Sequence, residues 1–199
     1  CGPFSLTGQP NAMGGREVGG LANQLAAHMD FAPEDVERVR RFWQTPAIAT
    51  RPGLKAVELF QAIADGKIKA LWIMGTNPVV SLPDADAARA ALQRCPLVVV
   101  SDAVADTDTV RLAHVKLPAL TWGEKDGTVT NSERRISRQR TFLPPPGEAK
   151  PDWWAVTQVA HRLGFADRFP FESPAAIFRE HAALSGFENE GRRDFDISA

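Results

Sequence analysis

Ile68-Lys-Ala-Leu-Trp-Ile-Met-Gly-Thr-Asn-Pro78 and Leu97-Val-Val-Val-Ser-Asp102 are the two stretches that decide the fold. Each begins with a short apolar run that does not alternate, which is typical of a buried strand in a parallel sheet. Between them, Pro83 and Asp84 begin a helix that reaches Arg94, with apolar residues at helical spacing. A strand, a helix and a second strand in this order predict a βαβ unit. We therefore expect an α/β fold with parallel strands covered by helices on both faces.

The flanking sequence predicts further helices and a less regular beginning. Glycines and prolines crowd residues 1–16, so we expect a loop there. Apolar spacing, proline at first turns and glycine after last turns predict the other elements. The expected helices are 17–29, 33–45, 54–64, 152–163 and 173–184, with a short helix near 109–112, a brief strand at 114–117 and β signals around 128–130.

Composition limits the class of protein. The chain has 199 residues, of which 24% are charged. Its formal net charge of -1 argues against nucleic acid as the main partner. No apolar run approaches the roughly 20 residues that cross a bilayer, and no secretion signal is visible. Two cysteines cannot build a disulfide scaffold or a four-thiolate metal site. Because the chain begins Cys-Gly-Pro-Phe, we expect a piece of a longer protein; removal of a short leader is the alternative.

Polar residues follow both predicted strands, where α/β proteins bind ligands. The loops that begin at Gly75 and at Ser101 offer Thr76, Asn77 and Asp102 as hydrogen-bonding groups. A nucleotide site is one interpretation, and an ordinary turn with a helix cap is the other. Spacing alone leaves both open, while the absence of a Gly-x-Gly-x-x-Gly fingerprint disfavours NAD.

Two groups of cations could bind anions. Arg16 lies on a glycine-rich loop before the predicted helix, where its charge and the helix N–H groups would attract a small anion, although a salt bridge is the simpler role. A second group can clamp phosphates or form a solvated face. The four histidines show no metal-ligand spacing, and no nucleophile–base pair is recognisable. The second group is Arg134, Arg135, Arg138 and Arg140.

Four motifs in register resemble the molybdopterin-dependent oxidoreductases of the dimethyl sulfoxide reductase superfamily. They are Gly2-Pro-Phe-Ser-Leu-Thr-Gly-Gln-Pro-Asn-Ala-Met-Gly-Gly-Arg-Glu-Val-Gly-Gly20, Trp72-Ile-Met-Gly-Thr-Asn-Pro-Val-Val-Ser81, Val98-Val-Val-Ser-Asp102 and Trp122-Gly-Glu-Lys-Asp-Gly-Thr-Val-Thr-Asn-Ser-Glu-Arg-Arg-Ile-Ser137. The first motif favours the assimilatory nitrate reductases within this superfamily. One departure is His114, where much of the superfamily has Asp.

The resemblance implies a Rossmann-like three-layer sandwich, the family's third domain, with a mostly parallel sheet and helical segments at both ends. It implies one domain over 1–199, with an active-site loop and helices in 1–50, a cofactor-binding core in 51–143 and a helical segment in 144–199. That domain would hold part of a bis-molybdopterin guanine dinucleotide. The cysteines for a [4Fe–4S] cluster and for molybdenum would lie outside this sequence, so we expect no metal ligand in it.

The resemblance also assigns roles to individual residues. Gln9, Met13 and Arg16 would approach the metal and the substrate. Gly75, Thr76, Asn77, Pro78, Ser101 and Asp102 would face the guanosine diphosphate end of the cofactor. Gly127, Thr128, Asn131, Glu133 and Arg134 would lie along the cofactor or at the domain contact around it.

The activity so implied is reduction of nitrate to nitrite by oxygen-atom transfer in a cytoplasmic enzyme of nitrate assimilation. Its partners would be the remaining domains of the enzyme and an electron-donor protein or subunit, without nucleic acid or membrane. The isolated piece would hold no cofactor and have no activity. Two alternatives stay open: a non-catalytic nucleotide-binding or interaction module, and the central domain of a thiamine-diphosphate enzyme.

Overall fold

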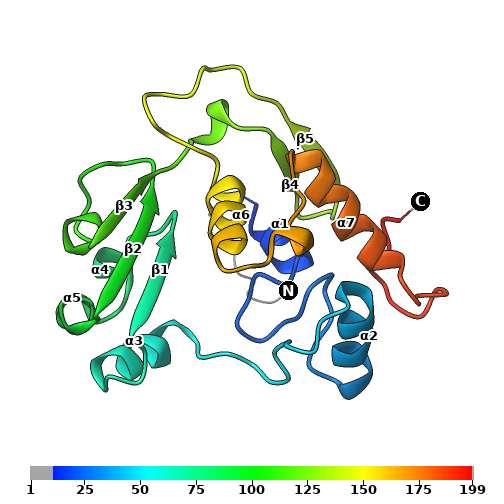
Figure 1. Cartoon of the computed structure of the whole chain (residues 1–199), viewed down its shortest axis with the longest axis horizontal. Coiled ribbons are helices and arrows are strands. Elements are labelled where there is room, and N and C mark those ends of the chain that lie inside the picture. The colour runs from blue at the N-terminus through cyan, green and yellow to red at the C-terminus, as the bar shows by residue number, and fades with distance from the viewer. Residues whose placement is uncertain (1–10, 199) are drawn as a thin grey trace, which may run out of the picture. The chain divides into compact units, whose positions relative to one another are not determined.

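The computed structural model describes residues 11–198, and their contacts divide the chain into two compact units (Figure 1). Unit 1 contains residues up to Gly53, Asp126–Arg140 and the residues from Pro170 on, whereas unit 2 contains Leu54–Lys125 and Thr141–Phe169. The sequence predicts one domain in three consecutive segments, but this division is not consecutive. Residues 126–140 belong to unit 1 although residues on both sides of them belong to unit 2.

Unit 2 contains the predicted βαβ unit. Strands β1 (Ala70–Met74), β2 (Leu97–Asp102) and β3 (Val115–Pro118) form a parallel sheet in the order β1-β2-β3. Helix α5 (Ala85–Arg94) connects β1 to β2, and the Asp84 side chain caps it by accepting from the N–H of Ala87. The prediction of parallel strands is therefore confirmed.

Helices cover one face of this sheet more fully than the other. Val98 and Val100 of β2 are buried with Leu92 of α5 and Ile63 of α3 (Ala56–Ala64) in one apolar core. Because side chains alternate along a strand, Leu97 points to the opposite face of the sheet from Val98 and Val100. Leu97 is 42% exposed. The second face is thus only partly covered, in contrast to the expectation of helices on both faces.

Short elements complete unit 2. The backbone turns after β1 into α4 (Pro78–Ser81), which the sequence analysis treats as loop. An isolated parallel bridge between Ala119 and Lys150 brings the chain after β3 beside the segment that leads into α6 (Asp152–Arg162). The remaining elements are the 3₁₀ turns η1 (Val110–Leu112), η2 (Trp122–Glu124) and η3 (Ala166–Arg168).

In the part of unit 1 that the structure describes, three helices combine with a hairpin. The helices are α1 (Ala12–Glu17), α2 (Pro33–Trp43) and α7 (Pro174–Gly186), and the antiparallel hairpin pairs β4 (Gly127–Thr130) with β5 (Ile136–Gln139). Its buried apolar core includes Leu25, Met29, Val36, Val39, Leu184 and Phe195.

The helix predicted over residues 17–29 is wrong. Helix α1 ends at Glu17, and turns follow it. Gly19 has a φ of +81° and the ideal Cβ position on it lies 2.0 Å from the carbonyl oxygen of Leu25, so the chain folds back tightly there. Leu21, on the apolar stripe that suggested a helix, is 45% exposed. The spacing of apolar residues is therefore coincidental here.

Candidate functional site

The ends of β1 and β2 meet at one edge of the sheet. Met74 lies opposite Ser101 in the parallel register, and the N–H of Gly75 donates to the carbonyl of Ser101 over 2.9 Å. Gly75 has a φ of +60° with no atom within 4 Å of its ideal Cβ position, so the backbone at this turn is open. Gly75 and Thr76 are exposed. The edge therefore presents an accessible backbone, as the position of these loops predicts.

Asn77 ties the loop after β1 to the loop after β2. Its Oδ1 accepts from the hydroxyl of Thr109 over 2.6 Å and from the N–H of Thr109 over 3.2 Å. Thr109 is fully buried, and its Oγ1 in turn accepts from the N–H of Val79 over 3.3 Å. The side-chain oxygen of Asn77 thus holds the edge in shape, and Pro78 is buried beside it.

Ser101 and Asp102 end β2 at the same edge. Ser101 is buried, and its Oγ accepts from the indole Nε1 of Trp72 over 2.8 Å, which leaves its own hydroxyl proton to donate. Oδ1 of Asp102 accepts from the N–H of Val104 over 2.9 Å. Both side chains are therefore oriented before any ligand binds.

A pocket of about 420 Å³ lies at this end of unit 2. This volume falls within the roughly 300–1,000 Å³ of small-molecule sites. Ser101 and the end of β3 form one wall, and the segment that leads into α6 forms the other. The lining residues are Ser101, Leu117, Pro118, Ala119, Gly147, Glu148, Lys150, Asp152, Trp154 and Ala155.

The pocket carries charges of both signs. Burial raises the pKa of the Asp152 carboxyl, and the nearby Asp102 adds to the rise, whereas Lys125, with Nζ 4.0 Å from Oδ2, opposes it. Lys150 lies with Nζ 5.9 Å from the centroid of the Trp154 ring. An ammonium group, carboxyl groups and a hydroxyl can together bind a ligand that has phosphates and N–H donors.

Unit 1 contains the other predicted residues. Arg16 is exposed in the last turn of α1, and within residues 11–198 its guanidinium makes no ion pair or side-chain hydrogen bond. The sequence predicts that a helix begins just after Arg16 and that its N–H groups help to bind an anion. This prediction is wrong, because α1 ends at Glu17 instead of beginning there. Met13 lies half-buried on the same helix, while Gln9 falls outside the described residues.

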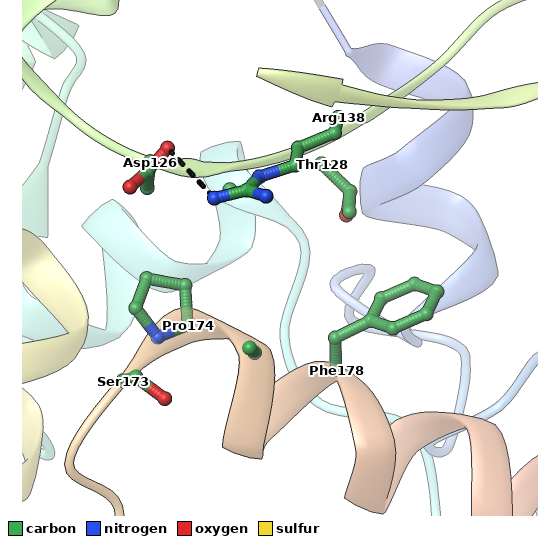
Figure 2. A pocket seen from close by; sticks show the side chains of 8 residues that line it. Asp126, Thr128, Arg138, Ser173, Pro174 and Phe178 are labelled. Carbon is green, nitrogen blue, oxygen red and sulfur yellow. Dashed lines mark ion pairs between the residues drawn. The ribbon is translucent and has the colours of Figure 1, made fainter. Parts of the chain in front are cut away.

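The hairpin residues serve different purposes. Gly127 and Thr128 line a pocket of about 390 Å³ between the hairpin and the beginning of α7 (Figure 2). In this pocket Nη2 of Arg138 lies 3.9 Å from Oδ1 of Asp126, and Phe178 of α7 forms part of the lining. At the hairpin loop, Glu133 is exposed, while Asn131 and Arg134 are engaged within unit 1.

A family model described as molybdopterin oxidoreductase matches residues 4–162. The chain belongs to the molybdopterin oxidoreductase family. The resemblance that four motifs predict is thereby confirmed.

Relatives of this molybdopterin oxidoreductase chain are much longer than it. A nitrate reductase from Klebsiella oxytoca is 68% identical over 197 residues, which are 99% of this chain and 23% of that protein. A nitrate reductase from Shewanella frigidimarina is 62% identical over 93% of this chain and 20% of that protein. The solved acetylene hydratase from Pelobacter acetylenicus has a TM-score of 0.59 at 23% identity, over 79% of this chain and 23% of that one, which supports the fold alone. The chain thus spans about a fifth to a quarter of their lengths.

The predicted site residues of this molybdopterin oxidoreductase chain form two groups. Among residues 11–198, one group is at the sheet edge of unit 2, and the other is on α1 and the hairpin of unit 1. Sequence reasoning missed Glu148, Lys150 and Asp152, because they reach the pocket through the non-local bridge between Ala119 and Lys150. No pattern within residues 144–152 signals that pairing. Within residues 11–198, no helix has the length and apolar character needed to cross a bilayer.

Proposed function

We propose that the chain is part of the catalytic subunit of a molybdenum-dependent nitrate reductase that converts nitrate to nitrite by oxygen-atom transfer. The observation that carries the proposal is the close likeness to two bacterial nitrate reductases over nearly the whole chain. The activity belongs to the full-length enzyme, and we expect none from these 199 residues alone.

Unit 2 fits the nucleotide end of a molybdopterin guanine dinucleotide. We assign unit 2 to the family's third domain, a Rossmann-like three-layer sandwich with a mostly parallel sheet. Guanine presents N–H donors from which the Asp152 carboxyl in the pocket can accept hydrogen bonds, and Lys150 supplies a cation for phosphate. Asp102 would accept from the same ligand at the adjoining end of β2. The hydroxyl of Ser101 can donate from the pocket wall. Gly75, Thr76, Asn77 and Pro78 would shape the adjoining edge.

Unit 1 fits the substrate side of the reaction. When bound, the cofactor would supply a molybdenum centre for oxygen-atom transfer and the two electrons that the conversion of nitrate to nitrite needs. We propose that Arg16 attracts nitrate and holds it in one orientation by charge-assisted hydrogen bonds. Met13 and Gln9 would also approach the metal and the substrate, and Gly127 and Thr128 would lie along the cofactor. We also place Asn131, Glu133 and Arg134 at that cofactor or at the domain contact around it.

The whole enzyme needs components outside this chain. We propose that a [4Fe–4S] cluster, held by residues elsewhere in the enzyme, passes electrons from a donor protein or subunit. The remaining domains would complete the cofactor site. A role in nitrate assimilation and a cytoplasmic location are part of the same proposal, on the resemblance to assimilatory enzymes.

The test removes the cation from Arg16 in the full-length enzyme. Because one charge-assisted contact in a water-excluded site is worth about 2–4 kcal/mol in the transition state, Arg16→Ala should lower kcat/KM for nitrate by roughly 30- to 1,000-fold. Arg16→Lys keeps the charge without the planar fork and should lose less.

Metal and pterin analysis of each variant provides the control. Molybdenum content should match that of the unsubstituted enzyme, because Arg16 is exposed and supports no other side chain within residues 11–198. Unchanged nitrate kinetics in Arg16→Ala with full molybdenum content would exclude the role of Arg16. Reduction of another oxyanion in preference to nitrate would reject the substrate.

A further inference from the structure

Glu17 is a charged residue in the interior of unit 1. Its side chain is 3% exposed, and its oxygens face Arg134 and His28. Nε and Nη2 of Arg134 donate to Oε1 and Oε2 of Glu17 over 2.7 and 3.1 Å, and Nδ1 of His28 lies 3.0 Å from Oε2. A buried carboxylate requires such partners, because an unpaired charge in the interior is strongly unfavourable. One carboxylate therefore joins α1, the turn at His28 and the hairpin.

The hairpin loop is shaped to present Arg134. Oδ1 of Asn131 accepts from the N–H groups of Glu133 and Arg135 over 3.0 and 2.9 Å, which closes the loop around Arg134. Arg134 itself has a φ of +62°, a left-handed conformation that is uncommon for a residue with a side chain. Its guanidinium also lies 5.5 Å from the centroid of the buried Phe195 ring. The loop geometry and the ring together direct this arginine toward Glu17.

Helix α1 depends on these contacts because it is short. Six residues are too few for a helix to be stable alone, so its orientation is set by what it binds. At its beginning, Oδ1 of Asn11 accepts from the N–H of Thr130 over 2.8 Å. At its end, Glu17 binds Arg134. These two attachments to the same hairpin fix both the direction of the helix and its rotation about its own axis.

Arg16 immediately precedes Glu17 on this helix. Successive residues of an α-helix are separated by about 100° around the axis, so fixing Glu17 inward also fixes the direction of the exposed Arg16. We propose that the Glu17–Arg134 pair is a positioning device that orients Arg16 toward nitrate. This inference rests on the proposed role of Arg16 in substrate binding, and it assigns Arg134 a role through Glu17.

The test uses the full-length, molybdenum-containing enzyme. Glu17→Gln keeps the shape of the side chain but removes its charge, and Arg134→Lys keeps the charge but loses the two-point contact. Because a displacement of about 1 Å can cost a hundredfold in rate, we expect Glu17→Gln to lower kcat/KM for nitrate by about 10- to 100-fold. Arg134→Lys should lose less. Arg135→Gln, which removes the neighbouring cation of the same loop, is the matched control and should stay within about twofold.

Combination with Arg16→Ala distinguishes positioning from general structural support. If Glu17 acts through Arg16, Glu17→Gln should add nothing further to Arg16→Ala, whereas independent effects would multiply. A multiplied loss, or a loss in Arg135→Gln as large as in Arg134→Lys, overturns the positioning role while the proposed function stands. Unchanged kinetics in Arg16→Ala would instead reject the proposed role of Arg16 and this inference with it. Loss of molybdenum from both Glu17→Gln and Arg134→Lys would assign the pair to folding or to cofactor binding and overturn the inference.

Discussion

Replacing Asn77 by alanine should destabilise the edge of unit 2 where we place the nucleotide. The substitution removes the acceptor for both the N–H and the hydroxyl of Thr109, a residue with no exposed surface. A buried donor left without a partner costs about 1–3 kcal/mol. The N–H cannot turn elsewhere, while the hydroxyl can rotate toward another acceptor, so we expect a total of about 2–4 kcal/mol.

Asn77→Asp is the matched control. Its carboxylate keeps an oxygen at the same place and adds a negative charge before the first turn of α4 (Pro78–Ser81), where negative charge is favourable. We therefore expect this variant to lose less than about 1 kcal/mol. Thr109→Val gives a second comparison, because it removes the hydroxyl and leaves the N–H bond to Asn77.

Hydrogen exchange measures this edge directly. The amides of Val79 and Thr109 both donate to side-chain oxygens of the network, so their exchange reports its opening. At about 1.4 kcal/mol per tenfold change, a loss of 2–4 kcal/mol in Asn77→Ala corresponds to exchange roughly 30- to 1,000-fold faster. Equal exchange rates in Asn77→Ala and Asn77→Asp would refute the argument that the shared oxygen holds the two loops together.

Three other outcomes follow from single residues. Gly14→Ala should lower the free energy of unfolding by about 1–2 kcal/mol, because the added Cβ would lie 2.1 Å from Oδ1 of Asn11 and displace that side chain. Gly15→Ala adds its Cβ to open space and should raise the free energy of unfolding by up to about 1 kcal/mol, so equal urea midpoints of the two variants would contradict the argument. Burial lowers the pKa of His181, while the carboxylate of Glu17 opposes the change, so His181 takes up a proton more readily in the unfolded chain than in the folded one. The free energy of unfolding should therefore fall as the pH drops below about 6.5, and His181→Gln should lessen that fall between pH 7.5 and 5. The same dependence of unfolding free energy on pH in both proteins would count against this role of His181. Guanosine diphosphate should bind the 199-residue chain in calorimetry, and Lys150→Ala should weaken the binding by about tenfold, whereas identical titrations would remove Lys150 from the phosphate site.

The strands and long helices were predictable because their signals are local. The apolar runs before Met74 and Val100 and the proline at position 33 predict β1, β2 and the beginning of α2, and the structure confirms them within a few residues. Burial of branched residues in a central strand and restriction of the backbone by proline act at the position itself. Such elements need no distant partner to be recognised.

Helix α1 could not be predicted, because its stability comes from residues far along the chain. Asn11 binds Thr130, and Glu17 binds Arg134, at separations of 119 and 117 residues. The same separation prevents a prediction that Arg134 pairs with Glu17, because local composition suggests only a phosphate ligand or a solvated cation. The pocket of unit 2 presents a similar difficulty, since Ser101 and Asp152 line it from segments that no local pattern connects.

Because both units are discontinuous in sequence, their parts are synthesised at different times. All strands of the unit 2 sheet lie between Ala70 and Pro118, so the ribosome completes them before it adds Arg134. Glu17 must then remain hydrated, with its position in the interior unfilled, until about 117 further residues have emerged. Phe195, which covers the guanidinium of Arg134, comes later still. The nascent chain thus contains the complete sheet of unit 2 before it contains the residues that hold the segment of Arg16 in place.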